Sequence, residues 1–259
     1  VVLRSATSVN DRELMLKTHL VVHPLVALES HSCYPNAVWT AAASATSARR
    51  GHRRTEVAHD PGNVRLLAVR DIAAGEQITI CYGAMWQRRD ERRADMRANY
   101  AFTCKCDRCE LRLPRARAAL DFAPPRDTND ATASRRVAAA QSLYERAEAS
   151  TDTAESVRLL REWLKAVKGS LNTYSDRYRM AFEALVVLAY DARDDATVCR
   201  YGDFYVRLVR GVYPRLWPRQ LFVLDRLMDS ARRTGNTDIL QRYGDDYALL
   251  TTALGTFTT

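Results

Sequence analysis

The string CKCDRC at residues 104–109 decides how the N-terminal part of the chain folds, because it holds three cysteines in close succession. A fourth cysteine, Cys33, lies far upstream in the string SHSCYPN at residues 30–36. A structural zinc ion takes four soft ligands in a tetrahedron, with each thiolate sulfur about 2.3 Å from the metal. The short string can supply three of these ligands, and the fold must bring in the fourth. The sequence therefore predicts one zinc ion that ties two remote segments together through Cys33, Cys104, Cys106 and Cys109.

The composition is that of a folded chain with a moderate positive charge. The 259 residues are 47% hydrophobic and 27% charged, which suffices for one large domain or two modest ones. The net charge of +8 divides evenly at Glu110, so neither half is a basic tail. No apolar run approaches the length of a membrane span, and we expect no membrane partner.

The cysteine usage predicts a reducing compartment. Besides the four proposed ligands, Cys81 and Cys199 have no evident disulfide partner. A metal–thiolate site beside unpaired thiols is typical of an intracellular protein. We therefore expect the cytoplasm or the nucleus, with the mitochondrial matrix as the alternative. The sequence starts at Val1 without an initiator methionine or a signal peptide, as a processed or truncated product would.

The segment between the two cysteine strings predicts short strands joined by loops. Ala37–Ala43 reads as a strand, and the small and basic residues of Ser44–Gly62 read as a loop. Runs rich in apolar and β-branched residues at Val64–Val69 and Gln77–Tyr82 predict two further strands. A turn signal around Gly75 lies between these runs, so we expect the pair to close a small, irregular sheet.

Downstream of Met85 the sequence predicts helices. Arg88–Tyr100 alternates its charges, and we expect a helix that exposes them to solvent. After Pro124-Pro125, segments of similar length are separated by glycine and proline. Such a series is typical of stacked helical hairpins and predicts a TPR-like array. The predicted helices are Ser134–Ala149, Thr153–Lys168, Ser175–Arg193, Thr197–Val209, Arg219–Arg233 and Thr237–Leu250.

Three strings follow one another along the chain: SHSCYPN at 30–36, RDIAAGEQITICY at 70–82 and YAFTCKCDRC at 100–109. In this order they resemble the C-terminal half of a SET domain and its post-SET zinc loop, as found in the SMYD group of protein-lysine methyltransferases. The helical remainder fits this group by order and composition. We therefore predict an α+β fold, with small SET-type sheets and a zinc loop followed by an all-α, TPR-like array. The predicted parts are a partial SET domain (1–84), a post-SET zinc-binding segment (85–113), a linker (Pro114–Arg126) and a helical domain (126–259).

The resemblance implies roles for three aromatic residues. Methyl transfer to an amine needs a neutral nitrogen in line with a sulfonium methyl, in a narrow polar channel. By resemblance, Tyr82 is the catalytic tyrosine, Tyr100 is the second tyrosine of the channel, and Phe102 packs on the adenine of S-adenosylmethionine. Plainer interpretations stay open, because Tyr82 could be a core tyrosine at a strand end and Phe102 could pack under the zinc loop.

The SHSCYPN string carries the other implied contacts. Ser30 and His31 stand where the Asn-His pair of the family meets S-adenosylmethionine, although His31 could act through its backbone alone. Asn36 resembles the asparagine that hydrogen-bonds where two chain segments cross. Serine is shorter than asparagine and lacks the amide, so this departure at residue 30 costs about 1 kcal/mol or more in cofactor binding.

A second departure concerns the glycine-rich turn with which a complete SET domain holds its cofactor. The first glycine of this sequence is Gly51, so no such turn precedes SHSCYPN. The cysteine-rich MYND finger that accompanies the SMYD group is also absent from the sequence. We expect either that further sequence completes the domain or that the cofactor pocket has decayed.

These observations support two functions. The first is an S-adenosylmethionine-dependent protein-lysine methyltransferase that acts on a protein substrate. The alternative is a catalytically inactive, SET-derived scaffold in a larger ribonucleoprotein or organellar assembly. The basic group Arg49–Arg54 favours the scaffold if it binds RNA phosphates, but it could equally be a solvated loop. In either case the helical array would bind a protein partner.

Overall fold

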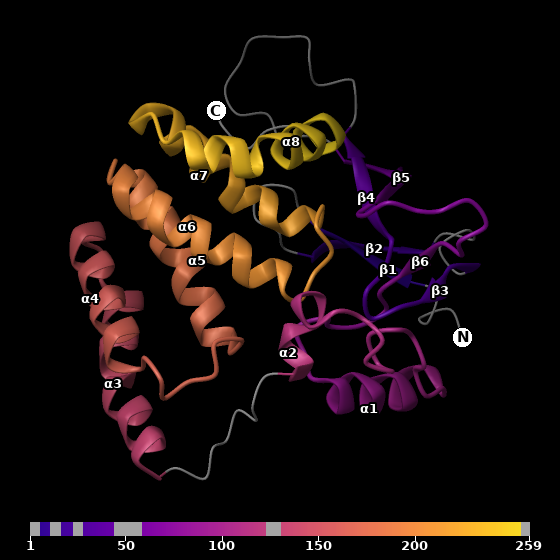
Figure 1. The fold of residues 1–259 in the computed structure, drawn as a ribbon, viewed down its shortest axis with the longest axis horizontal. Helices are drawn as coiled ribbons and strands as arrows, with labels where there is room; N and C mark the ends of the chain where they lie inside the picture. The colour runs from indigo at the N-terminus through magenta and orange to yellow at the C-terminus, as the bar shows by residue number, and fades with distance from the viewer. Residues whose placement is uncertain (1–5, 11–16, 23–27, 44–58, 123–130, 255–259) are drawn as a thin grey trace. The chain divides into compact units, whose positions relative to one another are not determined.

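The structure is a computed structural model that describes residues 6–10, 17–22, 28–43, 59–122 and 131–254 (Figure 1). Contacts divide the chain into two compact units. The first unit holds residues 1–113 with the segments 214–219 and 250–255, and the second holds 114–213, 220–249 and 256–259. The fold is α+β, as predicted, since small sheets and a cysteine cluster precede a mostly helical region.

The strands of the first unit form three two-stranded sheets among the described residues. In the first sheet, β1 (Ala6–Asn10) runs antiparallel to β2 (Lys17–Val22). No strand was predicted in this part of the chain. In the second sheet, β4 (Ala37–Ala43) runs antiparallel to β5 (His59–Ala68), and Trp39 stands opposite Leu66.

The limits of β4 match the strand predicted for Ala37–Ala43. By contrast, β5 begins at His59, upstream of the predicted start at Val64, so the end of the predicted loop 44–62 belongs to a strand. The remainder of that loop, with Arg49–Arg54, lies outside the described residues.

The predicted pairing of the Val64–Val69 and Gln77–Tyr82 runs is wrong. The turn between them is present, because Glu76 N–H donates to Ala73 O at 3.0 Å and Gly75 adopts a positive φ of 80°. However, β6 (Thr79–Ile80) pairs in parallel with β3 (Ser30–His31), and β5 pairs with β4. The reason lies in Asn36, whose side chain occupies the backbone groups of residues 77 and 79 that a hairpin would use.

Helix α1 (Arg89–Tyr100) follows the last strand and confirms the predicted helix. Arg88 N–H donates to Glu91 Oε2 at 2.8 Å, which satisfies a backbone donor at the start of the helix. The expectation that this helix exposes its charges is wrong at one position, because Arg92 is only 2% exposed. Arg92 and the buried Met96 lie four residues apart and therefore share the inward face of the helix.

The second unit confirms the six predicted helices, with ends shifted by a few residues. Successive helices pack against one another from α3 to α7, as Figure 1 shows. Side chains of Asp152, Ser175 and Asp194 cap the starts of three helices by accepting backbone N–H groups. The observed helices are α3 (Ala131–Ala149), α4 (Thr153–Ala166), α5 (Asp176–Asp191), α6 (Asp195–Arg210), α7 (Leu221–Thr234) and α8 (Thr237–Leu254).

The interior of the second unit is apolar and local in sequence. Trp163 on α4 is fully buried, and its ring lies 5.2 Å from the ring of Tyr144 on α3 and 5.8 Å from that of Tyr178 on α5. Leu159 on α4 and Val167 at its C-cap are buried as well. None of the described helices is both long enough and apolar enough to cross a bilayer.

The described part of the segment predicted as a linker, residues 114–122 of Pro114–Arg126, is folded. It contains a 3₁₀ turn at Arg115–Arg117 and the short helix α2 (Ala119–Phe122). Leu120 is fully buried, and Ala119 N–H donates to Gly211 O at 3.0 Å. Apolar residues among the arginines of this segment therefore anchor it within the second unit.

Candidate functional site

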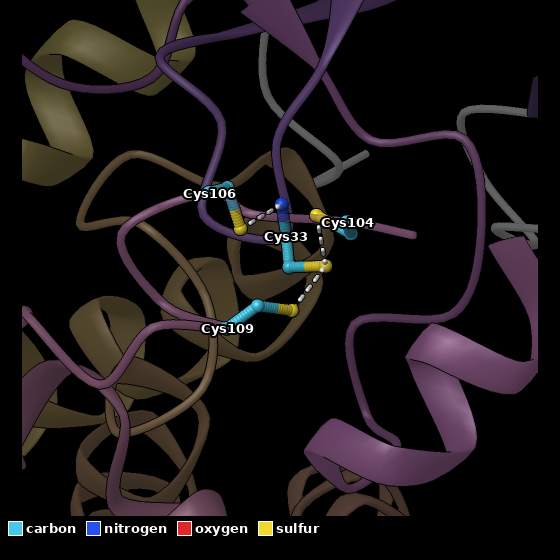
Figure 2. Close-up of side chains that lie close together, drawn as sticks. All are labelled: Cys33, Cys104, Cys106 and Cys109. Carbon is cyan, nitrogen blue, oxygen red and sulfur yellow. Dashed lines mark hydrogen bonds between the residues drawn. The ribbon is translucent and has the colours of Figure 1, made fainter. Parts of the chain in front are cut away.

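The four predicted zinc ligands converge in the first unit (Figure 2). Their sulfur atoms all lie within 4.8 Å of one another, and Cys33 Sγ is 3.6 Å from Cys109 Sγ and 3.9 Å from Cys104 Sγ. A tetrahedron of sulfurs around zinc has edges of about 3.8 Å, whereas a disulfide bond is about 2.05 Å long. The four cysteines are free thiols, and their spacing fits one metal ion.

The electrostatics of the cluster also fit a metal. Hydrogen bonds to Cys104 and its neighbours raise the pKa of Cys33, while bonds from Cys104, Cys109 and Cys33 lower the pKa of Cys106. The thiols thus share protons, because four thiolates at this distance repel one another. A divalent cation at the centre would let all four ionise together.

Two buried arginines lie beside the cluster. Arg108 is fully buried and donates from Nη1 to Cys33 O at 3.1 Å, and Arg92 Nη2 lies 3.8 Å from Cys109 Sγ. A buried cation is costly unless an opposite charge compensates it. A zinc ion with four thiolates carries two net negative charges, which suits two guanidinium groups. The donor set and its surroundings therefore fit zinc, and sequence reasoning had overlooked both arginines.

Asn36 connects the segment that carries Cys33 to the segment Glu76–Thr79. The Asn36 side chain is fully buried and donates from Nδ2 to Glu76 Oε1 at 3.0 Å and to Gln77 O at 2.9 Å. Thr79 N–H donates back to Asn36 Oδ1 at 2.8 Å. The predicted hydrogen bonding of Asn36 across two chain segments is confirmed, and it fixes the strand that leads to Tyr82.

Glu76 completes this junction. Its carboxylate bonds Arg70 Nη2 at 2.6 Å and accepts from Ala73 N–H at 3.1 Å. Arg70 above all, then the Ala73 N–H and Asn36, lower the pKa of Glu76 to about 2. The carboxylate therefore stays ionised in neutral solution and holds the turn against Asn36.

The predicted aromatic residues lie together beside the cysteine cluster. The ring of Tyr82 is 5.0 Å from the rings of both His31 and Tyr100, and Phe102 is 5.9 Å from His31. These half-buried side chains of Tyr82, Tyr100 and Phe102 pack on the core formed by the cysteines and Met96. Packing of Phe102 under the zinc loop, one of the plainer interpretations, is thus present.

The polar groups of Tyr82 are all engaged. Its hydroxyl donates to Glu29 O, and its carbonyl oxygen accepts from Tyr100 Oη at 3.1 Å. Burial raises the pKa of Tyr82 and of Tyr100, so both phenols remain protonated in neutral solution. Burial likewise lowers the pKa of His31 to about 4 and keeps its imidazole neutral.

Ser30 has a role that the sequence did not reveal. Ser30 Oγ accepts a hydrogen bond from Gln77 Nε2 at 2.8 Å, and its backbone pairs with Thr79. Ser30 therefore joins the two parallel segments. The carbonyl of the preceding residue, Glu29, accepts from the Tyr82 hydroxyl, and the ring of Phe102 lies 5.9 Å from that of the following residue, His31. An aromatic ring beside neutral oxygens suits a ligand with an aromatic ring and a cationic centre.

Comparison with known proteins agrees with this site. Residues 7–83 match the SET domain family. The human and mouse proteins named histone-lysine N-methyltransferase SMYD3 are each 34% identical over 89 residues, which is 34% of this chain and 17% of each relative. A yeast protein from Meyerozyma guilliermondii, histone-lysine N-methyltransferase SET5, is 32% identical over 81 residues, or 31% of this chain and 14% of that protein.

The N-terminal region of the chain is therefore a SET domain. Within that family the chain is SMYD-like, as the three sequence strings predicted. The SET match begins at residue 7, upstream of those strings, and takes in β1 and β2. The aligned region spans only about a sixth of the length of the curated relatives.

Proposed function

We propose that this chain belongs to an S-adenosylmethionine-dependent protein-lysine methyltransferase, with Tyr82 as the catalytic residue. The observation that carries the proposal is the gathering of Tyr82, Tyr100, Phe102 and His31 against a four-cysteine cluster, at the end of the region that matches the SET domain family. The relatives named as histone-lysine methyltransferases support a lysine side chain of a protein as the methyl acceptor.

The residues of this chain would act by positioning. S-Adenosylmethionine, when bound, supplies the methyl group as a sulfonium. Tyr82 Oη donates its proton to Glu29 O, so the lone pairs of Oη would accept from an amine N–H and a methyl C–H. Because burial keeps the phenol protonated, Tyr82 orients the amine and does not take its proton.

The remaining assignments follow from the same arrangement. Ser30 and His31 would border the cofactor, Tyr100 would hold the Tyr82 carbonyl, and Phe102 would stack on the adenine. Zinc on Cys33, Cys104, Cys106 and Cys109 would hold these residues in register and take no part in the chemistry.

Two measurements on the full-length protein test the proposal. Calorimetry should detect binding of S-adenosylmethionine, and Tyr82→Phe should lower the rate of methyl transfer to lysine peptides roughly 100-fold with binding retained. Tyr201→Phe, which removes a phenol from α6 in the second unit, is the matched control and should leave the rate unchanged. Absence of cofactor binding, or equal rates for Tyr82→Phe and wild type, would exclude the proposal.

The second candidate is a SET-derived scaffold that binds RNA or an acidic partner. It is favoured by the engagement of Ser30 Oγ with Gln77, which removes a polar contact from the cofactor, and by the net charge of +8. The scaffold predicts an association whose affinity falls steeply with salt. Charge reversal across Arg49–Arg54 should abolish it, and an unchanged association would remove this loop as the contact.

The free thiols support a reducing compartment for either function. All six cysteines are unpaired, including Cys81 and Cys199. We propose the cytoplasm or nucleus, with the mitochondrial matrix as alternative, and the TPR-like helical unit as the surface for a protein partner. Imaging of the tagged full-length protein would decide the compartment.

A further inference from the structure

His31 lies between a proposed metal ligand and the proposed catalytic residue. Its Nε2 atom is 3.2 Å from Cys33 Sγ, and its Nδ1 atom is 3.1 Å from the backbone nitrogen of Tyr82. One imidazole ring therefore touches both parts of the site through opposite edges. Cys33 is two residues from His31 in the chain, whereas Tyr82 is 51 residues away.

The direction of these hydrogen bonds follows from the donors available. The backbone N–H of Tyr82 can only donate, so His31 Nδ1 must be the unprotonated, accepting nitrogen. A neutral imidazole then carries its proton on Nε2, which points at Cys33 Sγ. When Cys33 is a metal-bound thiolate, this contact becomes an N–H···S bond to a charged acceptor, which is stronger than a bond to a thiol.

The position of Tyr82 explains why its backbone needs such a partner. The β3–β6 ladder ends at Ile80, which pairs with His31 itself, so Tyr82 lies beyond the ladder. Its carbonyl oxygen accepts from Tyr100 Oη, and its N–H turns to the His31 ring. The main chain at Tyr82 is thus held by two side chains in place of a neighbouring strand.

We propose that His31 is a positioning residue that couples the metal on Cys33 to the main chain of Tyr82. A metal ion on Cys33 would fix the position of its sulfur, and the imidazole would pass that restraint from Cys33 Sγ, through Nε2 and Nδ1, to the peptide unit of Tyr82. A role of this coupling in catalysis rests on the proposed function, whereas the coupling between Cys33 and Tyr82 does not. His31 would then do more than contact the cofactor through its backbone.

Three substitutions of His31 test the hydrogen bonds of Nδ1 and Nε2 separately. His31→Asn places an amide oxygen near the position of Nδ1 and keeps an acceptor for Tyr82 while losing the donor to sulfur. His31→Gln places an amide nitrogen near Nε2 and keeps the donor while losing the acceptor. His31→Phe keeps the ring and loses both bonds, so it reports what packing alone supplies.

The first experiment loads the full chain with Co²⁺ and records the sulfur-to-cobalt charge-transfer band. His31→Phe and His31→Asn should shift this band and weaken zinc affinity about 10- to 100-fold in chelator competition, whereas His31→Gln should stay near wild type. An unchanged band and affinity in His31→Phe would show that the imidazole does not act on the metal and would overturn the proposal.

The second experiment follows the Tyr82 amide by NMR in protein labelled with ¹⁵N-tyrosine, the signal being identified by its loss in Tyr82→Phe. Exchange of bound zinc for cadmium, which keeps the first unit folded, should move this signal in wild type and much less in His31→Gln and His31→Phe. An equal movement in all three proteins would overturn the coupling. Neither readout requires methyl transfer, so a protein that shows the coupling without enzymatic activity would refute the proposed function and leave this inference standing.

Discussion

The two units of the molecule are stabilised in different ways. In the second unit, neighbouring helices bury apolar side chains such as Trp163 against partners from the adjoining helices. In the first unit, a few polar or metal-binding residues connect segments that are far apart, as Cys33 does with Cys109 across 76 positions. The second unit should therefore respond to a single substitution only near the changed residue. The stability of the first unit should depend on a few junction residues.

Metal removal should give the largest effect, and it tests the difference between the two units most directly. Structural zinc sites of this type bind with about 10–16 kcal/mol of apparent free energy, so a chelator should unfold much of the first unit. Hydrogen exchange read by mass spectrometry should show lost protection in residues 28–43 and 79–109 and retained protection in α3 to α6. Cys104→Ser should reproduce this result, and Cys199→Ser in α6 is the matched control. Loss of protection in both units together would contradict the comparison.

Trp163→Ala tests the second unit. Removing a fully buried indole that contacts two other rings should cost about 3–5 kcal/mol, because it leaves a cavity among the helices. Urea unfolding followed by circular dichroism should show the loss, with zinc affinity unchanged. If the zinc affinity fell as well, the two units would not be energetically separate.

Asn36→Ala tests a junction that needs no metal. The change removes the amide that bonds Gln77 O and Thr79 N–H inside the first unit, and it should cost about 2–4 kcal/mol by leaving buried groups unpaired. Asn99→Ala on the exposed face of α1 is the control. The measurement is urea unfolding of the zinc-loaded chain, and equal stability of the two variants would remove Asn36 as a junction residue.

A pH titration should give the smallest effect. The folded state lowers the pKa of Glu76 to about 2, so the unfolded chain binds this proton more readily at low pH. The contribution of Glu76 to stability is therefore complete above about pH 4.5 and is lost as the pH falls toward 2. Over this pH range, the stability of the first unit should change less in Glu76→Gln and in Arg70→Met than in wild type. An unchanged pH profile in both variants would contradict the assignment.

The sequence predicted the second unit more fully than the first. The spacing of apolar residues predicts helices α3 to α8, and helix-breaking residues predict their ends. One such residue is Gly235, which ends α7 with a φ of 65°. The four cysteines were predicted because soft ligands at this spacing have few other uses. The convergence of the four cysteines could thus be predicted from residue chemistry alone.

The strand pairing and the burial of two arginines could not be predicted from the sequence. A parallel pair of two residues, Ser30–His31 with Thr79–Ile80, leaves no periodic pattern, so a hairpin across Gly75 looked simpler. Arg92 and Arg108 lie in segments whose composition is typical of a solvated helix and loop. Only the folded structure shows that Arg92 contacts Cys109 Sγ and that Arg108 donates to the carbonyl oxygen of Cys33. The same holds for the His31 contacts.

The separation of Cys33 from its partner sulfurs has a consequence for synthesis of the protein. While the ribosome extends the chain from residue 33 to residue 109, the nascent Cys33 has no companion ligands, since the span of 76 positions must first emerge. During that interval the thiol is open to oxidation and to stray metals, and the β3 segment has no β6 to pair with. Completion of the cysteine cluster therefore waits on Cys109, and a zinc ion bound there would link maturation of the newly made protein to the zinc supply at that moment.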